Sequence, residues 1–268
     1  MEWFEAIILG LVQGLTEFLP VSSSGHLEIG KEILSIETTD DLMFTTMVHA
    51  ATVLSTIVVF RKQILDLFKG LFKFKYNDQT DYVFKIALSC VPIMIVGLFF
   101  KEDVEALFGS IKVVGFALLL TSALLFFSDL ASRRDKVTNP ASESRNGISY
   151  WQAFVVGLGQ ALAVIPGLSR SGTTISTGLI CGVRRDVMAQ FSFLMVLIPI
   201  LGESFLELVG GELSASSVGA LPLVLGFLSA FVSGLFACKV MIALVRKAKL
   251  SWFAVYCLIA AAAIFIFA

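Results

Sequence analysis

The sequence predicts an all-α integral membrane protein with two inverted-topology repeats, six transmembrane helices and two re-entrant helical hairpins. The 268 residues are 57% hydrophobic and 15% charged, with a mean hydropathy of +0.88, so the chain has more apolar surface than a soluble core can bury. Several segments are apolar and approach the length of a membrane span. The chain also resembles itself at a fixed offset, and each copy contains an apolar region interrupted by Pro, Gly and Ser.

The N-terminal segment is expected to belong to the fold, because Glu2 and Glu5 stand where a secretory signal peptide would carry basic residues. The cysteines occur singly inside apolar segments and are interpreted as packing residues: Cys90, Cys181, Cys238 and Cys257. The net charge of −1 gives no electrostatic reason for a nucleic-acid partner, and we expect none.

The predicted spans follow from length and composition, since a spanning helix needs about 20 predominantly apolar residues. The segments that approach this length are 44–60, 86–100, 113–128, 188–209, 220–245 and 252–268. Two further apolar regions, 1–34 and 150–181, are interrupted by FLPVSSSGH and VIPGLSRSGTT. Non-helical backbone is tolerated at membrane depth only where it is buried in protein or lines a wet cavity, so each region predicts a re-entrant helical hairpin. The alternative is a spanning helix kinked at proline.

The distribution of positive charge predicts the orientation. With both hairpins re-entrant and the N-terminus outside, four loops fall inside and carry most of the 20 Lys and Arg residues: 61–85, 129–149, 183–186 and 246–249. The positive-inside rule favours this topology, which opens the first hairpin toward the outer side. Arg170 and Lys239 are the basic residues left within the membrane region.

An internal repeat appears when the sequence is aligned with itself at an offset of 147 positions. The identical pairs are Gly10/Gly157, Leu11/Leu158, Gln13/Gln160, Leu15/Leu162, Ser22/Ser169, Ser24/Ser171 and Gly25/Gly172. The single membrane domain 1–268 thus divides into repeats 1–128 and 150–268, joined by a polar linker, 129–149. Each repeat holds one hairpin and three spans, and because three is odd the second enters the membrane upside down, so the serine-rich turns should meet near the midplane.

The first hairpin carries a polar face. Gly10, Gln13, Gly14 and Glu17 follow one another at i, i+3, i+4 and i+7 of a helix. A charged side chain at mid-membrane costs about 2.5 to 3.5 kcal/mol, so Glu17 should have a partner or a ligand. Glu17 and Gln13 offer oxygen ligands to a divalent cation. The alternative is a solvated glutamate near the outer interface.

Two serine-rich turns open the second helix of each hairpin and would point free backbone N–H groups into a site. The first turn is Ser22, Ser23, Ser24, Gly25 and His26, and the second is Ser169, Arg170, Ser171, Gly172, Thr173 and Thr174. Ser and Gly also favour caps and turns, which is the alternative interpretation.

The charged and nucleophilic side chains of these turns suit phosphoryl transfer, in which positioning and charge neutralisation supply most of the rate. Arg170 suits bidentate phosphate contacts, although it would also serve as a structural partner of Glu17. His26 would activate Ser23 or a water. The other histidine, His49, lies in an apolar span and is interpreted as a hydrogen-bonded packing residue.

The motifs QGLTEFLPVSSSGH at 13–26 and PGLSRSGTT at 166–174 resemble the two signature motifs of the undecaprenyl-diphosphate phosphatase family, also called the bacitracin-resistance family. The resemblance covers the whole chain in length and segment order. It implies a multi-pass enzyme of the bacterial inner membrane that hydrolyses a phosphoanhydride, converting undecaprenyl diphosphate to undecaprenyl phosphate and phosphate. This reaction would recycle the lipid carrier of cell-wall peptidoglycan synthesis and confer bacitracin resistance, with the site open toward the periplasmic side.

The resemblance also implies a divalent metal, Mg²⁺ or Ca²⁺, and residue roles. Glu17 would bind metal or assist catalysis, Ser23 would be the nucleophile, His26 its base or acid, and Arg170 the phosphate clamp. Phosphate-binding residues would be Ser22, Ser24, Gly25, Ser169, Arg170, Ser171, Gly172, Thr173 and Thr174. The family's first motif often has Glu where this chain has Gln13, so we expect Gln13 to be secondary to Glu17.

Other functions remain open at this point. Inverted repeats with broken helices are typical of transporters, which would use Glu17 and Arg170 but leave Ser23 and His26 without a task. An anion channel is disfavoured by the carboxylate, and lipid movement across the bilayer would be compatible with phosphatase activity. Attack by serine and attack by metal-bound water use the same groups. We expect a prenyl diphosphate lipid and the bilayer as partners, with a homodimer as a possible assembly.

Overall fold

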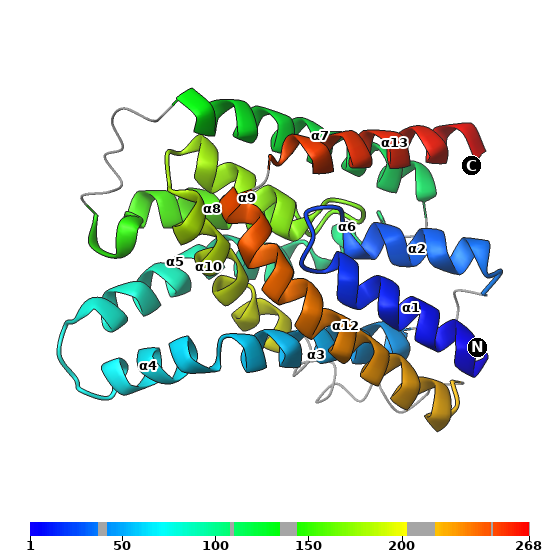
Figure 1. Cartoon of the computed structure of the whole chain (residues 1–268), viewed down its shortest axis with the longest axis horizontal. Helices are drawn as coiled ribbons and strands as arrows, with labels where there is room; N and C mark the ends of the chain where they lie inside the picture. Colours follow the sequence, from blue (N-terminus) through cyan, green and yellow to red (C-terminus); the bar gives the residue numbers. More distant parts are fainter. Residues whose placement is uncertain (37–41, 108–109, 135–143, 203–217, 248, 268) are drawn as a thin grey trace.

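The computed structural model describes residues 1–36, 42–107, 110–134, 144–202, 218–247 and 249–267 (Figure 1). Within these ranges the regular structure is helical, with no strand. The helices are α1 Trp3–Thr16, α2 Ser23–Ile33, α3 Leu42–Val59, α4 Arg61–Leu71, α5 Asp78–Phe99, α6 Lys101–Glu105, α7 Ile111–Arg134, η3 Arg145–Gly147, α8 Tyr150–Leu162, α9 Arg170–Ile180, α10 Arg185–Met195, α12 Ala220–Lys247 and α13 Ser251–Phe267. The all-α class is therefore confirmed for the described residues.

Long apolar segments make this chain a multi-pass membrane protein. By length and composition, four helical segments of the described residues could each cross a membrane: Asp78–Phe99, Ile111–Ser132, Arg185–Gly202 and Ala220–Val245. A fifth candidate is the pair Met43–Val59 and Arg61–Leu71, which is bent by 73°. The segment predicted at 252–268 forms α13, which is apolar but shorter. Of the segment predicted at 188–209, residues 203–209 lie outside the described residues.

Two of the expected loops contain helical residues. Residues 61–85 contain α4 and the first turns of α5, which begins at Asp78 because the Asn77 side chain accepts a hydrogen bond from the Thr80 backbone N–H at 2.8 Å. The linker expected at 129–149 begins inside α7, which continues to Arg134, and Asp129 is buried where it accepts a hydrogen bond from Arg185 at 2.6 Å. Residues 135–143 of that linker lie outside the described residues.

Both apolar regions with a serine-rich interruption form pairs of short helices. In the first, α1 packs against α2, and in the second, α8 packs against α9. The second helix of each pair has a serine N-cap at the corresponding position: Ser22 accepts from the Gly25 N–H at 3.2 Å, and Ser169 accepts from the Gly172 N–H at 3.1 Å. The sequence correctly predicted where each helix pair turns.

Each half of the chain provides a packing surface for the helix pair of the other half. Helix α1 packs along α12, α8 packs along α5, and the last long helices α7 and α13 lie side by side (Figure 1). Glycine allows the closest approaches: a Cβ on Gly10 would collide with the carbonyl oxygen of Gly226, and one on Gly157 would collide with the carbonyl oxygen of Ser89. Small residues at helix interfaces let backbones approach closely, as in other membrane proteins.

A buried ion pair ties α5 to the segment before α8. Lys85 Nζ lies 2.6 Å from Asp81 Oδ2, and both side chains are buried. Lys85 also donates to the Arg145 carbonyl at 2.7 Å, and Asp81 accepts from Tyr76 and Tyr150 at 2.6 and 3.0 Å. This network satisfies both charges, which explains how α5 can begin with charged residues.

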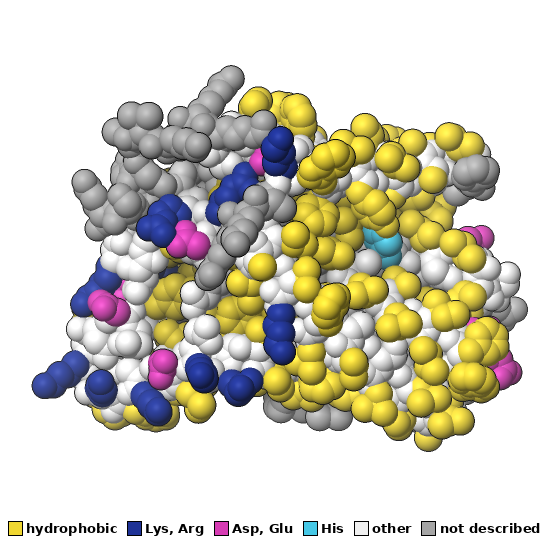
Figure 2. All heavy atoms as spheres, in the orientation of Figure 1, with side chains coloured by type: hydrophobic (Ala, Val, Ile, Leu, Met, Phe, Trp, Pro, Cys, Tyr) yellow, Lys and Arg dark blue, Asp and Glu magenta, His cyan; other side chains and the backbone are white. Residues whose placement is uncertain are grey.

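The visible surface separates charged and apolar regions. Lys and Arg side chains gather toward one end of the molecule, on the left in Figure 2 where α4 lies in Figure 1, whereas hydrophobic side chains dominate the right half of the face. Large apolar residues on this protein's surface include Leu98, Phe99, Phe116, Phe236 and Trp252, each more than half exposed. Such extensive apolar surface is typical of a protein that contacts lipid.

Candidate functional site

The two helix pairs enclose a pocket, which we call the hairpin pocket. Its empty volume is about 320 Å³, and its polar lining residues are Glu17, Ser23, Ser24, His49, Ser169 and Arg170. Two hydrogen bonds join the pairs here: the Gly167 N–H donates to Ser24 Oγ at 3.4 Å, and Ser171 Oγ donates to the Leu19 carbonyl at 3.1 Å. The expected meeting of the two serine-rich turns is therefore present in the structure.

Glu17, the residue that ends α1, is the central acceptor of the hairpin pocket. Its Oε2 atom accepts hydrogen bonds from Gln13 Nε2 at 3.0 Å and from Ser23 Oγ at 2.5 Å. The first contact follows from the i, i+4 spacing on α1, and the second from the turn that carries the chain back into α2. His49 Nε2 lies 3.9 Å from the same oxygen. A carboxylate that contacts a hydroxyl in this way is positioned to take its proton.

The histidine expected to activate Ser23 has other partners. His26 Nδ1 lies 2.7 Å from the Ser22 carbonyl oxygen, to which it must donate, because a carbonyl only accepts. His26 Nε2 lies 2.6 Å from the Tyr256 hydroxyl, and the two rings stack with centroids 5.6 Å apart. His26 does not line the hairpin pocket. It instead holds Ser22, whose φ of 72° is in the left-handed region and costs about 1–3 kcal/mol outside glycine.

The histidine interpreted as a hydrogen-bonded packing residue does have a backbone partner, but it also lies at the hairpin pocket. His49 Nδ1 lies 2.8 Å from the Thr45 carbonyl oxygen, which leaves Nε2 directed toward Glu17. A signal was present in the sequence: Thr45, His49, Thr52 and Thr56 form a polar stripe with helical spacing inside an otherwise apolar span. His49 lines the hairpin pocket, while Thr52 and Thr56 line a neighbouring cavity.

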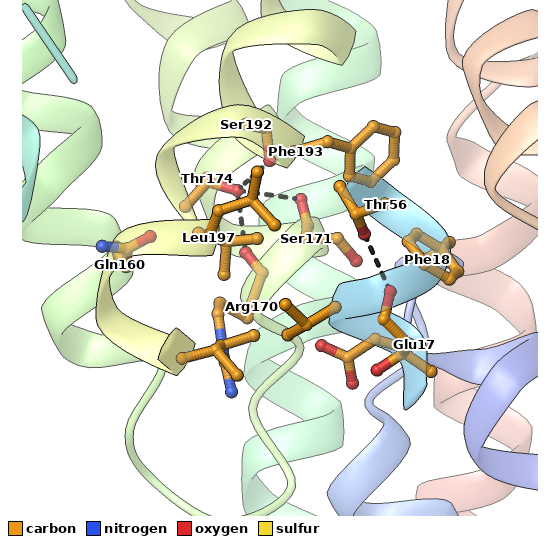
Figure 3. A pocket seen from close by; sticks show the side chains of 14 residues that line it. Glu17, Phe18, Thr56, Gln160, Arg170, Ser171, Thr174, Ser192, Phe193 and Leu197 are labelled. Carbon is orange, nitrogen blue, oxygen red and sulfur yellow. Dashed lines mark hydrogen bonds between the residues drawn. The ribbon is translucent and has the colours of Figure 1, made fainter. Parts of the chain in front are cut away.

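The neighbouring cavity, which we call the Gln160 cavity, has an empty volume of about 420 Å³ and shares Glu17 and Arg170 with the hairpin pocket (Figure 3). Its other polar lining residues are Thr52, Thr56, Gln160, Ser171, Thr174 and Ser192. Figure 3 shows Glu17 and Arg170 on one side of this cavity, with Thr174 and Ser192 on the other. Glu17 and Arg170 therefore line both cavities.

Arg170, the first residue of α9, presents its guanidinium to both cavities. Within the described part of the chain it forms no hydrogen bond or salt bridge through this group, so the guanidinium remains available to a ligand. A planar, permanently charged donor at a helix N-terminus suits an anion.

Most of the remaining predicted residues form hydrogen bonds within the two serine-rich turns. Among them, Ser22 and Ser169 cap α2 and α9, and Gly25 and Gly172 supply the capped N–H groups. Thr173 Oγ1 donates to the Ser169 carbonyl at 2.8 Å, and Gln13 is fully buried. Six of the predicted site residues line neither cavity: Gln13, Ser22, Gly25, His26, Gly172 and Thr173.

The donor set for a metal is small. Among the described residues, no group of three or more His, Cys, Asp or Glu side chains is close enough to hold an ion. Within the described ranges Glu17 is the one carboxylate that lines the hairpin pocket, and the buried Gln13 Oε1 has no hydrogen-bond partner there. Oxygen atoms of this kind suit Mg²⁺ or Ca²⁺, and Mg²⁺ is commonly held by one or two carboxylates together with phosphate oxygens of a substrate.

Comparisons with known proteins agree along the whole chain. The family model of bacitracin resistance protein BacA matches residues 6–263. A protein of Bacteroides fragilis named undecaprenyl-diphosphatase is 55% identical over 263 residues, which cover 97% of this chain and 96% of that protein. A protein of the same name in Parabacteroides distasonis is 56% identical over 264 residues, which cover 97% of this chain and 96% of that protein. Another in Halothermothrix orenii is 37% identical over 269 residues, which cover 100% of this chain and 99% of that protein. This chain belongs to the bacitracin resistance protein BacA family.

Proposed function

We propose that this protein hydrolyses undecaprenyl diphosphate to undecaprenyl phosphate and inorganic phosphate in the hairpin pocket. One observation carries the proposal: a serine hydroxyl, Ser23, donates to a carboxylate, Glu17, in a pocket that also presents the guanidinium of Arg170. A transporter would need the charges but not the serine contact. The relatives named undecaprenyl-diphosphatase, at 50 to 56% identity, support the same substrate.

Ser23 is the attacking group in this mechanism. Glu17 takes the hydroxyl proton while Ser23 Oγ forms a bond to the terminal phosphorus. The bond from that phosphorus to the bridging oxygen breaks, the bridging oxygen keeps the electron pair, and the proton passes from Glu17 to the leaving prenyl phosphate. His49 stands beside Glu17, with its Nε2 atom 3.9 Å from Glu17 Oε2, where the imidazole can exchange a proton with the carboxylate.

The phosphates bind between the two helix N-termini. Arg170 pairs with phosphate oxygens, and the first turns of α2 and α9 offer backbone N–H groups and the hydroxyls of Ser24 and Ser169. Charge neutralisation by fixed donors is the main source of rate in phosphoryl transfer. His26 contributes by holding the backbone of Ser22 and so the direction of α2.

A divalent cation, Mg²⁺ or Ca²⁺, fits this site. Glu17 would hold it through Oε1, since the contacts of Glu17 described above all use Oε2, and substrate phosphate oxygens would complete the set. Gln13 Oε1 has no hydrogen-bond partner among the described residues but does not line the pocket, so Gln13 would be a secondary ligand. When bound, such a cation neutralises charge on the phosphates.

The membrane arrangement that we propose has six spans and two re-entrant hairpins in inverted repeats, within the bacterial inner membrane and with the hairpin pocket open to the outer side. The reciprocal packing of α1 on α12 and of α8 on α5 supports inverted repeats. The cluster of Lys and Arg at one end supports the orientation (Figure 2). A homodimer stays a prediction, which light scattering in detergent would test.

The test is phosphate release from a prenyl diphosphate by purified protein in detergent, with and without EDTA. We expect metal-dependent release that falls at least about 10²-fold in Glu17→Ala and in Arg170→Ala. Glu28→Ala is the matched control, because Glu28 is a partly exposed glutamate of α2 that pairs with Lys31. Folded wild-type protein that releases no phosphate would reject the enzyme and favour a carrier.

A further inference from the structure

The Gln160 cavity has a feature that the proposed reaction does not use. Gln160 is fully buried on α8, and neither its amide nitrogen nor its amide oxygen has a hydrogen-bond partner among the described residues. A buried polar group without a partner costs about 1–3 kcal/mol, so a ligand that can both donate and accept is expected beside it.

Apolar side chains form much of the cavity wall, namely Phe18, Val53, Phe193, Val196, Leu197 and Ile200, and its polar part consists largely of hydrogen-bond acceptors. Thr52 Oγ1 donates to the His49 carbonyl at 2.7 Å, and Thr56 Oγ1 donates to the Thr52 carbonyl at 3.0 Å (Figure 3). Ser171 likewise donates to the Leu19 carbonyl. Each of these hydroxyls donates its hydrogen to a backbone carbonyl, so only its lone pairs are available to a ligand in the cavity. The carboxylate of Glu17 adds further acceptor capacity.

The hydrogen-bonding groups of the wall suit some of the reaction's substrates and products better than others. Inorganic phosphate is an acceptor and would face lone pairs and a carboxylate, with only Arg170 and the Gln160 amide nitrogen as clear donors. A prenyl chain would leave the Gln160 amide without partners. Water both donates and accepts, and it is the second substrate of a hydrolysis.

We infer that the Gln160 cavity, which Glu17 lines and Ser23 does not, is the water site of the enzyme, from which water reaches Glu17. The inference rests on the proposed function. In this step the water oxygen bonds to the phosphorus carried by Ser23, and the bond from that phosphorus to Ser23 Oγ breaks. Glu17 takes one proton from the water and returns it to Ser23 Oγ, which releases inorganic phosphate and regenerates the enzyme.

The test compares wild type with Gln160→Leu, which removes both amide atoms at similar volume, and with Thr56→Val, which removes one hydroxyl. Ser176→Ala is the matched control, because Ser176 is a buried serine of α9 whose hydroxyl also lacks a described partner but lies outside both cavities. Phosphate release from a prenyl diphosphate is measured with methanol as a competing nucleophile, and the yields of methyl phosphate and inorganic phosphate are read by ³¹P NMR. Melting temperatures in detergent verify folding.

We expect kcat for phosphate release to fall about tenfold, the equivalent of about 1.4 kcal/mol, in Gln160→Leu, and by a smaller factor in Thr56→Val. KM should stay unchanged, and the share of methyl phosphate should rise in both. A folded Gln160→Leu protein with the wild-type kcat and methanol share would overturn the inference. So would an unchanged kcat with weaker inhibition by inorganic phosphate, since the cavity would then hold the product. Absence of activity in wild type would instead reject the proposed function.

Discussion

Ser23 Oγ and Glu17 Oε2 lie 2.5 Å apart across the turn that joins α1 to α2. The contact places the Ser23 hydroxyl directly against a carboxylate, without an intervening imidazole. Gln13 donates to the same oxygen, which fixes the carboxylate plane from the helix side. In the proposed mechanism the Ser23 proton therefore passes to Glu17, whereas His26 contacts the Ser22 carbonyl and Tyr256.

Replacing Glu17 by Gln removes the proton acceptor and keeps the side-chain shape. We expect kcat to fall by about 10²–10⁴-fold, the usual contribution of a general base. Rapid quenching with substrate labelled in the terminal phosphate should reveal a labelled serine in wild type and none in Ser23→Ala. A label that persists in folded Ser23→Ala would identify a different attacking group.

The two histidines should differ in their effects. His49→Gln removes the imidazole that faces Glu17, so we expect kcat to fall about tenfold or more, with little change in KM. Tyr256→Phe removes only the hydroxyl that contacts His26, a hydrogen bond worth about 1 kcal/mol, so activity should fall no more than about fivefold. Steady-state kinetics of both variants measure this, and a larger loss in Tyr256→Phe than in His49→Gln would contradict the assignment.

Replacing only one partner of the buried ion pair between Asp81 and Lys85 should destabilise the protein. Asp81→Asn leaves Lys85 as an uncompensated buried charge, and we expect a loss of about 3–5 kcal/mol in the free energy of unfolding. Adding Lys85→Met should restore much of that loss, because the double variant buries no charge. Thermal unfolding in detergent measures both.

The exposed pair of Arg184 and Asp186 provides the control for this experiment. Its removal by Asp186→Asn should change stability by less than about 1 kcal/mol, since solvent screens exposed pairs. Equal losses of unfolding free energy in Asp81→Asn and Asp186→Asn would show that burial of Asp81 and Lys85 does not govern how much this ion pair contributes to stability.

Close packing of α1 on α12 predicts a sharp response to one methyl group. In Gly10→Ala the new Cβ would collide with the Gly226 carbonyl and lie 2.9 Å from Ser229 Cβ, so we expect a loss of about 1–3 kcal/mol. Gly97→Ala on α5 is the control, because its Cβ would meet nothing within 4 Å. Melting temperatures that fall equally in both variants would indicate a general effect of losing glycine rather than contact between helices.

The sequence predicted the helix pairs and the residues of their turns because these depend on local signals. Pro, Gly and Ser interrupt apolar helices, and the same residue types recur in both halves. Even so, the two turns differ in detail. Positive φ falls on Ser22 in the first turn, whereas Ser169 has a φ of −68° and Gly167 has the positive φ in the second.

Which imidazole faces Glu17 could not be predicted from the motif, because that choice depends on distant segments. His26 is turned toward Tyr256, which follows it by 230 positions, while α3 brings His49 to the pocket. The helix at 61–71 differs, because its signal is local. Its many charged residues favour a loop, whereas its residues also have the spacing of an amphipathic helix.

The reciprocal packing of the helix pairs has a consequence for how the chain is made. Helix α8 emerges from the ribosome after α5, so the surface that receives it is already present. Helix α1 is synthesised before the other helices, yet its packing surface on α12 begins only at Ala220. During most of synthesis, Glu17 and Ser23 are therefore held on a helix pair without its final neighbour, and the membrane or its insertion machinery must shelter them. The two helix pairs have similar sequences but reach their final neighbours at different stages of synthesis. The first pair can complete its packing only after α12 has been synthesised.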